Sequence, residues 1–394
     1  MKDVVIVGAC RTPIGSFGGA LSSIQATGLG AIVIRELLLR TGIRSDAIDE
    51  VIMGNVLTAG EGQAPARQAA MFAKLPPSVE CMTINKVCGS GMKAIMLGAQ
   101  AIQLGDAEVV IAGGMESMSN APYLLDKLRG GHKMGNVELI DSMMKDGLWD
   151  VYNNYPMGNA AELCASECAV PREAQDQFAI LSYRRAQDSQ ASGRFKEEIV
   201  PVVIPQKKGD DLVVDEDEEP RKTNFDKIPQ LKPAFQKDGT VTAANSSKIN
   251  DGAAAVLLMS AEKAKELGLQ PLAKIVAAAS AAKKPEWFTT APADVIPKVL
   301  KKAGLSLDSI DLFEINEAFA VVALAVNKIL GIDSRIVNVN GGAVAMGHPI
   351  GASGARIVVT LIHALSQRKL KRGLAAICIG GGEASGIILE SMGQ

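Results

Sequence analysis

Apolar positions follow two spacings along this chain. Residues 31–42 (AIVIRELLLRTG) place apolar side chains at the spacing of a helix, and residues 107–114 (AEVVIAGG) form a short apolar run that ends in glycines, as a buried strand does. Continuous apolar strands that alternate with helices are typical of sheets covered on both faces. The pattern therefore predicts an α/β fold with mostly parallel sheets.

The same order of helices, strands and glycine-rich turns occurs twice. An offset of 262 residues aligns TGIRSDAIDEVIMGNV with AGLSLDSIDLFEINEA, and two further pairs, GSGMKA with ASGARI and IAGGMES with CIGGGEAS, follow in the same order. Such a repeat predicts a duplicated core whose two sheets stack with helices between them. The aligned segments are 41–56 with 303–318, 89–94 with 352–357, and 111–117 with 378–385.

One long segment, residues 119–249, has no counterpart in the repeat. We therefore divide the chain into an N-terminal core half (1–118), an inserted loop domain (119–249) and a C-terminal core half (250–394). Long inserts on a rigid scaffold usually carry binding function. We interpret the acidic run 215–219 as a solvated surface, whereas the basic residues around it could meet a phosphorylated ligand: Arg221, Lys222, Lys227, Lys232, Lys237 and Lys248.

Composition narrows the class of protein. A chain of 394 residues is too long for one ordinary core, and its net charge of −2 provides no field to attract nucleic acid or an anionic membrane. No apolar run approaches the roughly 20 residues that span a bilayer, and no signal peptide is recognisable, so a cytoplasmic location is expected. Six cysteines form no CxxC pair, and Cys164 and Cys168 lack a nearby histidine, so we expect reduced thiols and no metal site.

Cys88, in the segment NKVCGSGMKA, lies between a predicted strand and a predicted helix. The N–H groups and the dipole at a helix start favour a thiolate and would lower the pKa of the thiol. The flanking glycines allow a substrate carbonyl to approach the backbone. A small buried hydrophobe is the alternative interpretation of a single cysteine. On its own, this motif does not decide between a nucleophile and a core residue.

The second half supplies candidate partners for Cys88. His348 precedes the matching helix start, between glycines in a tight turn, and a base beside a cysteine is the usual way to generate its thiolate. Cys378 ends a predicted strand and opens onto three glycines, a position typical of clefts. Asn316 stands at a strand-to-helix junction, where it either caps the helix or holds a water or a carbonyl dipole.

The chain resembles the thiolase family along its whole length. The resemblance rests on RTPIGSFGG near the start and on four later blocks, NKVCGSG, NEAFA, GHPIGASGAR and CIGGG. It implies a five-layered αβαβα core of two similar halves with an inserted loop domain that binds coenzyme A and takes part in oligomerisation. It also implies acyl-CoA thioesters as substrates, coenzyme A as a substrate or product rather than a separate cofactor, and a homodimer or homotetramer.

The resemblance assigns roles to the catalytic candidates. Cys88 would carry the acyl group as a thioester, and His348 would activate it. His348 and a water held by Asn316 would then bind the thioester oxygen as it becomes an enolate. Cys378 would move the proton at C2 of the second acyl-CoA. The backbone N–H groups of Cys88 and Gly380 would form a second oxyanion site over the tetrahedral intermediate.

Further positions match substrate contacts of the family. Ser247 would contact the pantetheine and Arg221 the adenine end of coenzyme A. Two residues depart from the common pattern: Pro156 replaces a histidine that is frequent in members that form acetoacetyl-CoA, and Lys248 stands where a small residue is common. The acyl pocket would be lined by Met157, Phe235, Ala318 and Phe319, with Trp287 and Phe288 nearby to shorten it.

These features favour condensation of two acetyl-CoA to acetoacetyl-CoA and the reverse thiolysis, through an acyl-cysteine in a ping-pong reaction. A degradative 3-ketoacyl-CoA thiolase of broader chain length is the alternative. A ketoacyl synthase would need a second catalytic imidazole or a decarboxylating site and would lack Cys378, and a non-catalytic scaffold would have no reason to keep four reactive positions. The loop 123–139 is expected to join two dimers, with a structural role for His132.

Overall fold

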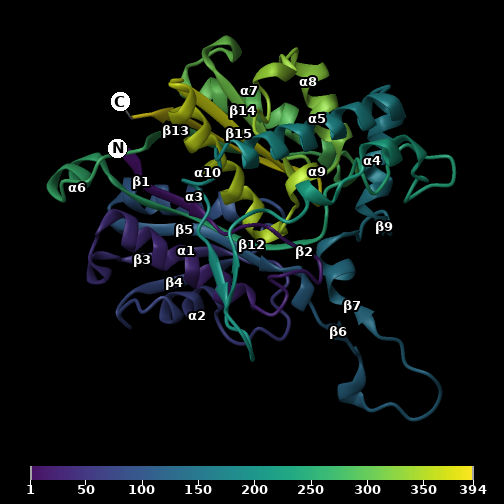
Figure 1. Cartoon of the computed structure of the whole chain (residues 1–394), viewed down its shortest axis with the longest axis horizontal. Coiled ribbons are helices and arrows are strands. Elements are labelled where there is room, and N and C mark those ends of the chain that lie inside the picture. The colour runs from purple at the N-terminus through teal and green to yellow at the C-terminus, as the bar shows by residue number, and fades with distance from the viewer. Residues whose placement is uncertain (1, 393–394) are drawn as a thin grey trace.

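The computed structural model describes residues 2–392 and contains two stacked halves with an insert beside them (Figure 1). The first half contains β1 (Val4–Arg11), β2 (Gly15–Ser16), α1 (Ala26–Thr41), β3 (Glu50–Gly54), α2 (Pro65–Phe72), β4 (Glu80–Ile84), α3 (Ser90–Leu104) and β5 (Val109–Ser117). The insert contains β6 (Tyr123–Leu124), β7 (Ile140–Asp141), β8 (Trp149–Asp150), β9 (Tyr155–Pro156), α4 (Met157–Glu167), α5 (Arg172–Ala191), β10 (Val202–Ile204) and β11 (Leu212–Val214). The remaining elements are β12 (Asn250–Ser260), α6 (Ala261–Glu266), β13 (Ala273–Ala282), α7 (Ala291–Ala303), β14 (Leu312–Ile315), α8 (Ala320–Leu330), α9 (Ala343–Met346), α10 (Ile350–Arg368), β15 (Arg372–Ile379) and β16 (Glu383–Ser391).

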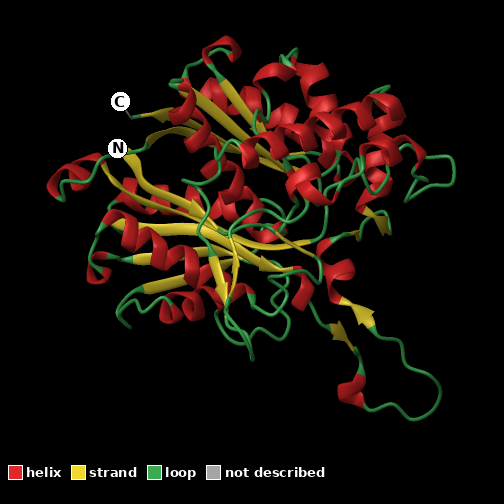
Figure 2. Ribbon diagram, in the orientation of Figure 1, coloured by secondary structure: helices red, strands yellow, loops and turns green. Residues whose placement is uncertain are grey.

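The core has the predicted five layers. Helices α1 and α2 cover the outer face of the first sheet, α3 and α10 lie between the two sheets, and α7 and α8 cover the second sheet (Figures 1 and 2). Separate apolar clusters fill the spaces between these layers, and the central cluster unites side chains of α3 and α10 with both sheets. No helix within residues 2–392 is long and apolar enough to cross a membrane.

The two sheets are linked in one hydrogen-bonded path. The strand order is β4-β3-β5-β12-β1 in the first sheet and β13-β16-β15-β14 in the second. The two sheets meet where Val5 pairs with Lys274 and Ile6 with Ala273. Strand β12 follows the insert along the chain, yet it lies between β1 and β5 and completes the first sheet.

The prediction of mostly parallel sheets is wrong. Among the described strands, only the pairs β3–β4, β3–β5 and β14–β15 are parallel, whereas β12 and β16 run antiparallel to every strand they pair with. Strand β16 must do so because it follows β15 directly through a tight glycine turn. Strand β12 begins where β5 ends, since Asp251 pairs with Ser117, so the chain returns from the insert at the same end of the sheet.

The internal repeat is visible in local structure. Helices α1 and α7 both end at a left-handed glycine, Gly42 (φ 68°) and Gly304 (φ 67°). A carboxylate oxygen of Asp49 accepts the N–H groups of residues 108 and 109, at 2.7 and 2.9 Å. Asp311, 262 residues later, accepts those of residues 371 and 372 at 2.9 and 2.7 Å. Each aspartate thus fixes the start of the strand beside it.

One of the aligned segment pairs is not equivalent in space. Strand β5 pairs with β3 so that Val110 lies opposite Glu50, and β15 pairs with β14 so that Gly373 lies opposite Leu312. Val110 therefore corresponds to Gly373, an offset of 263. The alignment of IAGGMES with CIGGGEAS is displaced by four residues, because glycine-rich strand ends look alike whether or not they occupy the same register.

Candidate active site

Cys88 lies in a constrained turn between β4 and α3. Val87, immediately before it, has a φ of 45°, a left-handed conformation that is rare for a β-branched residue and is found mainly where surrounding contacts enforce it. Those contacts are present: the Asn85 side chain accepts the N–H of Val87 at 2.9 Å, and the Ser90 hydroxyl donates to the Val87 carbonyl at 2.7 Å. The turn therefore holds the cysteine in one orientation.

The two glycines beside Cys88 allow close packing between the halves. A Cβ at Gly89 would lie 2.3 Å from the side chain of Ile379, and one at Gly91 would lie 2.8 Å from the backbone nitrogen of Ala355. Only glycine therefore lets the start of α3 rest against the end of β15 and against α10. This contact brings Cys88 to the Gly380 turn of the other half.

The two predicted catalytic thiols are neighbours. Cys88 is half-buried and Cys378 is buried, and the proximity of Cys88 raises the pKa of the Cys378 thiol. The backbone N–H groups of Gly380 and of Cys88 itself face the Cys88 sulfur and favour its thiolate. The structure thus places Cys88, Cys378 and Gly380 near one another; their predicted roles stay a prediction.

The prediction of a lowered pKa at Cys88 is wrong for the free enzyme. Burial raises the pKa of this thiol to about 11, the N–H groups of Gly380 and Cys88 offset only part of the increase, and the nearby Glu116 adds to it. Burial and the proximity of Cys88 also raise the pKa of Cys378. Both groups are thiols at neutral pH, because desolvation outweighs the helix start.

His348 is placed as a neutral base. Burial and the neighbouring Arg356 lower the pKa of His348 to about 3. The Ser353 hydroxyl donates to the Pro349 carbonyl at 2.9 Å and lies 2.6 Å from His348 Nδ1, so it accepts the Nδ1 proton. The lone pair is then on Nε2, which is buried and has no hydrogen-bond partner among the described residues.

Asn250 and Glu317 hold the loops that carry His348 and Asn316. The Asn250 side chain accepts the backbone N–H of His348 at 3.0 Å. Glu317 accepts the hydroxyl of Ser182 at 2.7 Å and the N–H of Val344 at 3.1 Å. Within residues 2–392, both polar side-chain atoms of the buried Asn316 lack a partner, so its amide remains free to bind a substrate oxygen or a water.

A narrow apolar cavity of about 220 Å³ leads to His348. Its wall includes Met157, Phe235, Ser247 and Phe319, and both unusual residues, Pro156 and Lys248, also line it. The Phe319 ring makes edge contacts with Phe235 and Phe288, with centroids 6.1 and 6.4 Å apart. Behind this wall, one apolar cluster contains Phe288, Ala318, Phe319 and Cys378.

A second cavity opens on the other side of Met157. It measures about 540 Å³ and is lined by Val87, Met157 and Gly380, with Trp149 and Tyr152 at its outer part. Because Met157 borders both spaces, its thioether separates the cavity at His348 from the turn that carries Gly380. The reacting groups therefore lie between two openings.

Arg221 lies apart from the other predicted substrate-binding residues. Its side chain is 67% exposed, on a short 3-10 turn at Pro220–Lys222, and it forms an ion pair with Glu216. It lines neither cavity. Its predicted contact with the adenine end of coenzyme A stays a prediction.

Sequence reasoning missed Glu116, a buried carboxylate that connects the halves. It accepts the N–H groups of Val56 and Leu57, both at 3.1 Å, and that of Gly351 at 2.8 Å. It thus connects the loop after β3 to the first turn of α10, directly after His348. A charged residue inside the apolar run of β5 was the available signal, because a buried carboxylate requires hydrogen-bond donors.

The whole chain matches one protein family. Residues 4–262 match the family model described as thiolase, N-terminal domain, and residues 269–391 match thiolase, C-terminal domain. An acetyl-CoA acetyltransferase of Schizosaccharomyces pombe is 57% identical over 389 residues, covering 98% of each chain. An acetyl-CoA acetyltransferase of Cupriavidus necator is 55% identical over 99% of this chain and 100% of its own.

Solved structures agree with these sequence matches. The Acat5 thiolase of Ascaris suum, determined in complex with coenzyme A, superposes with a TM-score of 0.94 at 49% identity, covering 99% of this chain and 100% of that one. The Bacillus anthracis acetyl-CoA acetyltransferase superposes with a TM-score of 0.97 at 44% identity and 99% coverage of both. The duplicated core is therefore that of an acyl-transferring enzyme. The chain belongs to the thiolase family.

Alkylation of Cys88 by iodoacetamide should accelerate without a plateau from about pH 7 to about pH 10. With a pKa of about 11 and a neutral His348, the thiolate fraction rises roughly tenfold for each pH unit below the pKa. Mass spectrometry of the labelled peptide measures the rate, and Cys88→Ser is the control for labelling at other cysteines. A rate that is already constant between about pH 7 and pH 9 would contradict this expectation.

Proposed function

We propose that this enzyme condenses two acetyl-CoA molecules to acetoacetyl-CoA and coenzyme A, and catalyses the reverse thiolysis, through an acetyl group on Cys88. The observation that carries the proposal is the proximity of the Cys88 and Cys378 thiols. His348, a neutral imidazole whose Nε2 has no partner among the described residues, is the candidate base. Relatives that are 52–57% identical over nearly the whole chain and bear the name acetyl-CoA acetyltransferase support the proposal.

In the first half-reaction, His348 Nε2 takes the proton of Cys88, and the thiolate attacks the carbonyl carbon of acetyl-CoA. The N–H groups of Cys88 and Gly380 face the oxyanion that forms. The C–S bond to coenzyme A then breaks, and Cys378 gives its proton to the departing thiolate. The products are acetyl-Cys88, free coenzyme A, protonated His348 and the thiolate of Cys378.

In the second half-reaction, the Cys378 thiolate removes a proton from C2 of another acetyl-CoA. Its raised pKa makes this thiolate a strong base. Protonated His348 and the Asn316 amide stabilise the enolate oxygen, and C2 attacks the acetyl group on Cys88. Cys88 leaves as a thiolate and regains its proton from His348. Every group returns to its starting state, and coenzyme A enters only as substrate and product.

The division of labour between the thiols can be tested with Cys378→Ala. This variant should still accept an acetyl group on Cys88, because water or His348 can protonate the leaving thiolate, but it should not exchange the C2 hydrogens of acetyl-CoA with deuterated solvent. Intact mass and exchange rate are measured in parallel. Cys88→Ser is the matched control and should form no adduct. Exchange at the wild-type rate in Cys378→Ala would assign the base to another residue.

The size of the cavity supports a short acyl chain. Its volume of about 220 Å³ is small, and its wall includes Phe235 and Phe319, with Phe288 in edge contact behind Phe319, so a short acyl group such as acetoacetyl fits it best. A broader 3-ketoacyl-CoA thiolase would need a longer apolar channel past these rings.

Thiolysis should therefore be most efficient with acetoacetyl-CoA. The ratio kcat/KM should fall by about tenfold or more for each two-carbon extension, since one excluded methylene costs about 1–3 kcal/mol. Steady-state kinetics over a series of 3-ketoacyl-CoA substrates measures this ratio. Phe235→Ala should relax the preference. An equal or higher efficiency for six-carbon or eight-carbon substrates would favour the degradative alternative.

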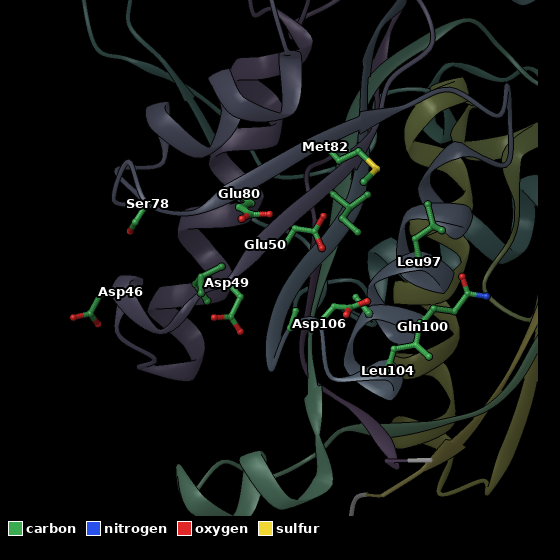
Figure 3. Close-up of a pocket in the computed structure, with 14 residues that line it drawn as sticks. Asp46, Asp49, Glu50, Ser78, Glu80, Met82, Leu97, Gln100, Leu104 and Asp106 are labelled. Carbon is green, nitrogen blue, oxygen red and sulfur yellow. The ribbon is translucent and has the colours of Figure 1, made fainter.

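We further propose that the enzyme assembles as a dimer or a tetramer. Strand β4 ends the first sheet and pairs only with β3 among the described strands, and its Met82 is 44% exposed. Beside it lies a hollow of about 700 Å³, where Glu50, Glu80 and Asp106 face Leu97 and Leu104 of α3 (Figure 3). A second copy seated along β4 would cover these apolar side chains and complete the sheet edge.

The loop 123–139 supports a second contact. It extends from the β6–β7 ribbon away from the body of the molecule (Figure 1) and exposes Met134 by 92% and Leu139 by 65%. His132 Nε2 lies 2.8 Å from the carbonyl oxygen of Gly135, within the loop itself. Exposed apolar side chains on a protruding ribbon are typical of interaction sites.

Shortening this loop should reduce the assembly from tetramers to dimers. Replacing residues 126–138 by a short glycine linker preserves β6 and β7 and removes the exposed apolar side chains. Light scattering measures the mass, and retained thiolysis activity controls for folding. An unchanged mass would contradict the proposed role of the loop.

A further inference from the structure

The Lys248 ammonium is held by backbone carbonyls instead of carboxylates. Its Nζ donates to the carbonyl oxygens of Ala243 at 2.7 Å, Ser246 at 2.9 Å and Val344 at 3.4 Å. The same atom lies 5.5 Å from the centre of the Tyr183 ring, over its face. All three N–H groups of the ammonium therefore have an acceptor, and the aromatic face adds a cation–π contact.

The carbonyls belong to the two segments that build the site. Ala243 and Ser246 lie just before Ser247 in the chain. The N–H of Ser247 itself donates to the Ala318 carbonyl at 2.9 Å. Val344 lies on α9, four residues before His348. The ammonium thus connects the Ser247 segment to α9 before the His348 turn, in addition to the bond from the His348 N–H to Asn250, and Lys248 itself lines the cavity beside both residues.

Val344 is held from two sides by opposite charges. Its N–H donates to the buried Glu317 at 3.1 Å, and its carbonyl accepts from Lys248 at 3.4 Å. Without a cation, the partly buried carbonyls of Ser246 and Val344 would converge with no donor between them, which is unfavourable, whereas the exposed carbonyl of Ala243 can bind water. The charge of Lys248, not only its aliphatic stem, is therefore what stabilises this geometry.

We propose that Lys248 is a positioning residue whose ammonium acts as a tethered internal cation, fixing Ser247 for coenzyme A binding and His348 for proton transfer. The inference rests on the proposed function, because it assigns Ser247 and His348 the roles given above. It explains why a long cationic side chain stands at a position where a small residue is common in the resembling family. The cation is supplied by the chain itself.

Two variants separate the ammonium from its stem. Lys248→Ala removes both, whereas Lys248→Met keeps an unbranched apolar stem without the charge. Lys298→Met is the matched control, since Lys298 Nζ also donates to a backbone carbonyl, that of Ser280 at 2.7 Å, but on the exposed face of α7. All are studied as full-length proteins in tetramethylammonium buffer, whose cation is too large to enter among the carbonyls.

Both Lys248 variants should bind coenzyme A about tenfold more weakly by calorimetry and turn over acetoacetyl-CoA about tenfold more slowly, each corresponding to about 1.4 kcal/mol. Lys298→Met should match the wild type in both measurements. Added ammonium chloride should restore Lys248→Ala, because the free ion can take the place of the lost ammonium. It should not restore Lys248→Met, whose stem occupies the same space.

Wild-type binding and turnover in Lys248→Met would overturn the proposal, because the stem alone would then suffice. A folded Lys248→Ala protein that ammonium does not restore would also overturn it. If Lys248→Ala does not fold, as judged by circular dichroism, coenzyme A binding and turnover of Lys248→Met alone test the proposal. The proposed function fails separately, through a wild-type enzyme that binds coenzyme A but does not cleave acetoacetyl-CoA.

Discussion

The close packing of α3 against α10 is the constraint on which the site depends. Gly91 of α3 lies against the backbone of Ala355, and Gly354 of α10 lies against the backbone of Met92, so that a Cβ at either glycine would come within 2.8 Å of a backbone nitrogen. Two helices from duplicated halves approach this closely only where side chains are absent. Their starts then meet, and the loops that precede them carry Cys88 and His348 into one place.

Burial determines the chemistry of the groups brought together there. In a site this poorly solvated, a separated thiolate and imidazolium would be costly, so the resting groups are neutral. The surroundings instead supply dipoles: the N–H groups of Cys88 and Gly380 at one thiol, and the buried amide of Asn316, which has no partner among the described residues. In the proposed reaction, the first half-reaction generates the charges on His348 and Cys378, and the second removes them. Burial raises the pKa of Cys378, so its thiolate would be a strong base.

The sequence was sufficient to predict the duplicated core, because motifs at strand ends and helix starts keep their spacing in both halves. The roles of the catalytic candidates stay a prediction. Sequence reasoning failed where the answer depends on three-dimensional surroundings. The pKa of Cys88 depends on solvent exclusion by the opposite half, which outweighs the local helix start. The direction of β12 depends on where the chain returns from the insert. The carbonyls around Lys248 come from segments about 100 residues apart, and no local pattern predicts that they converge.

The short seam between the two sheets has a mechanical consequence. Because β1 and β13 share backbone hydrogen bonds at Val5–Lys274 and Ile6–Ala273, the halves form one continuous elastic body instead of two lobes on a hinge. The ion pair between Lys86, two residues before Cys88, and Glu383, five residues after Cys378, also connects the two halves. Rotation of one half against the other would break the β1–β13 hydrogen bonds and this ion pair. Met157 borders both cavities, and its unbranched side chain can change rotamer without disturbing either contact.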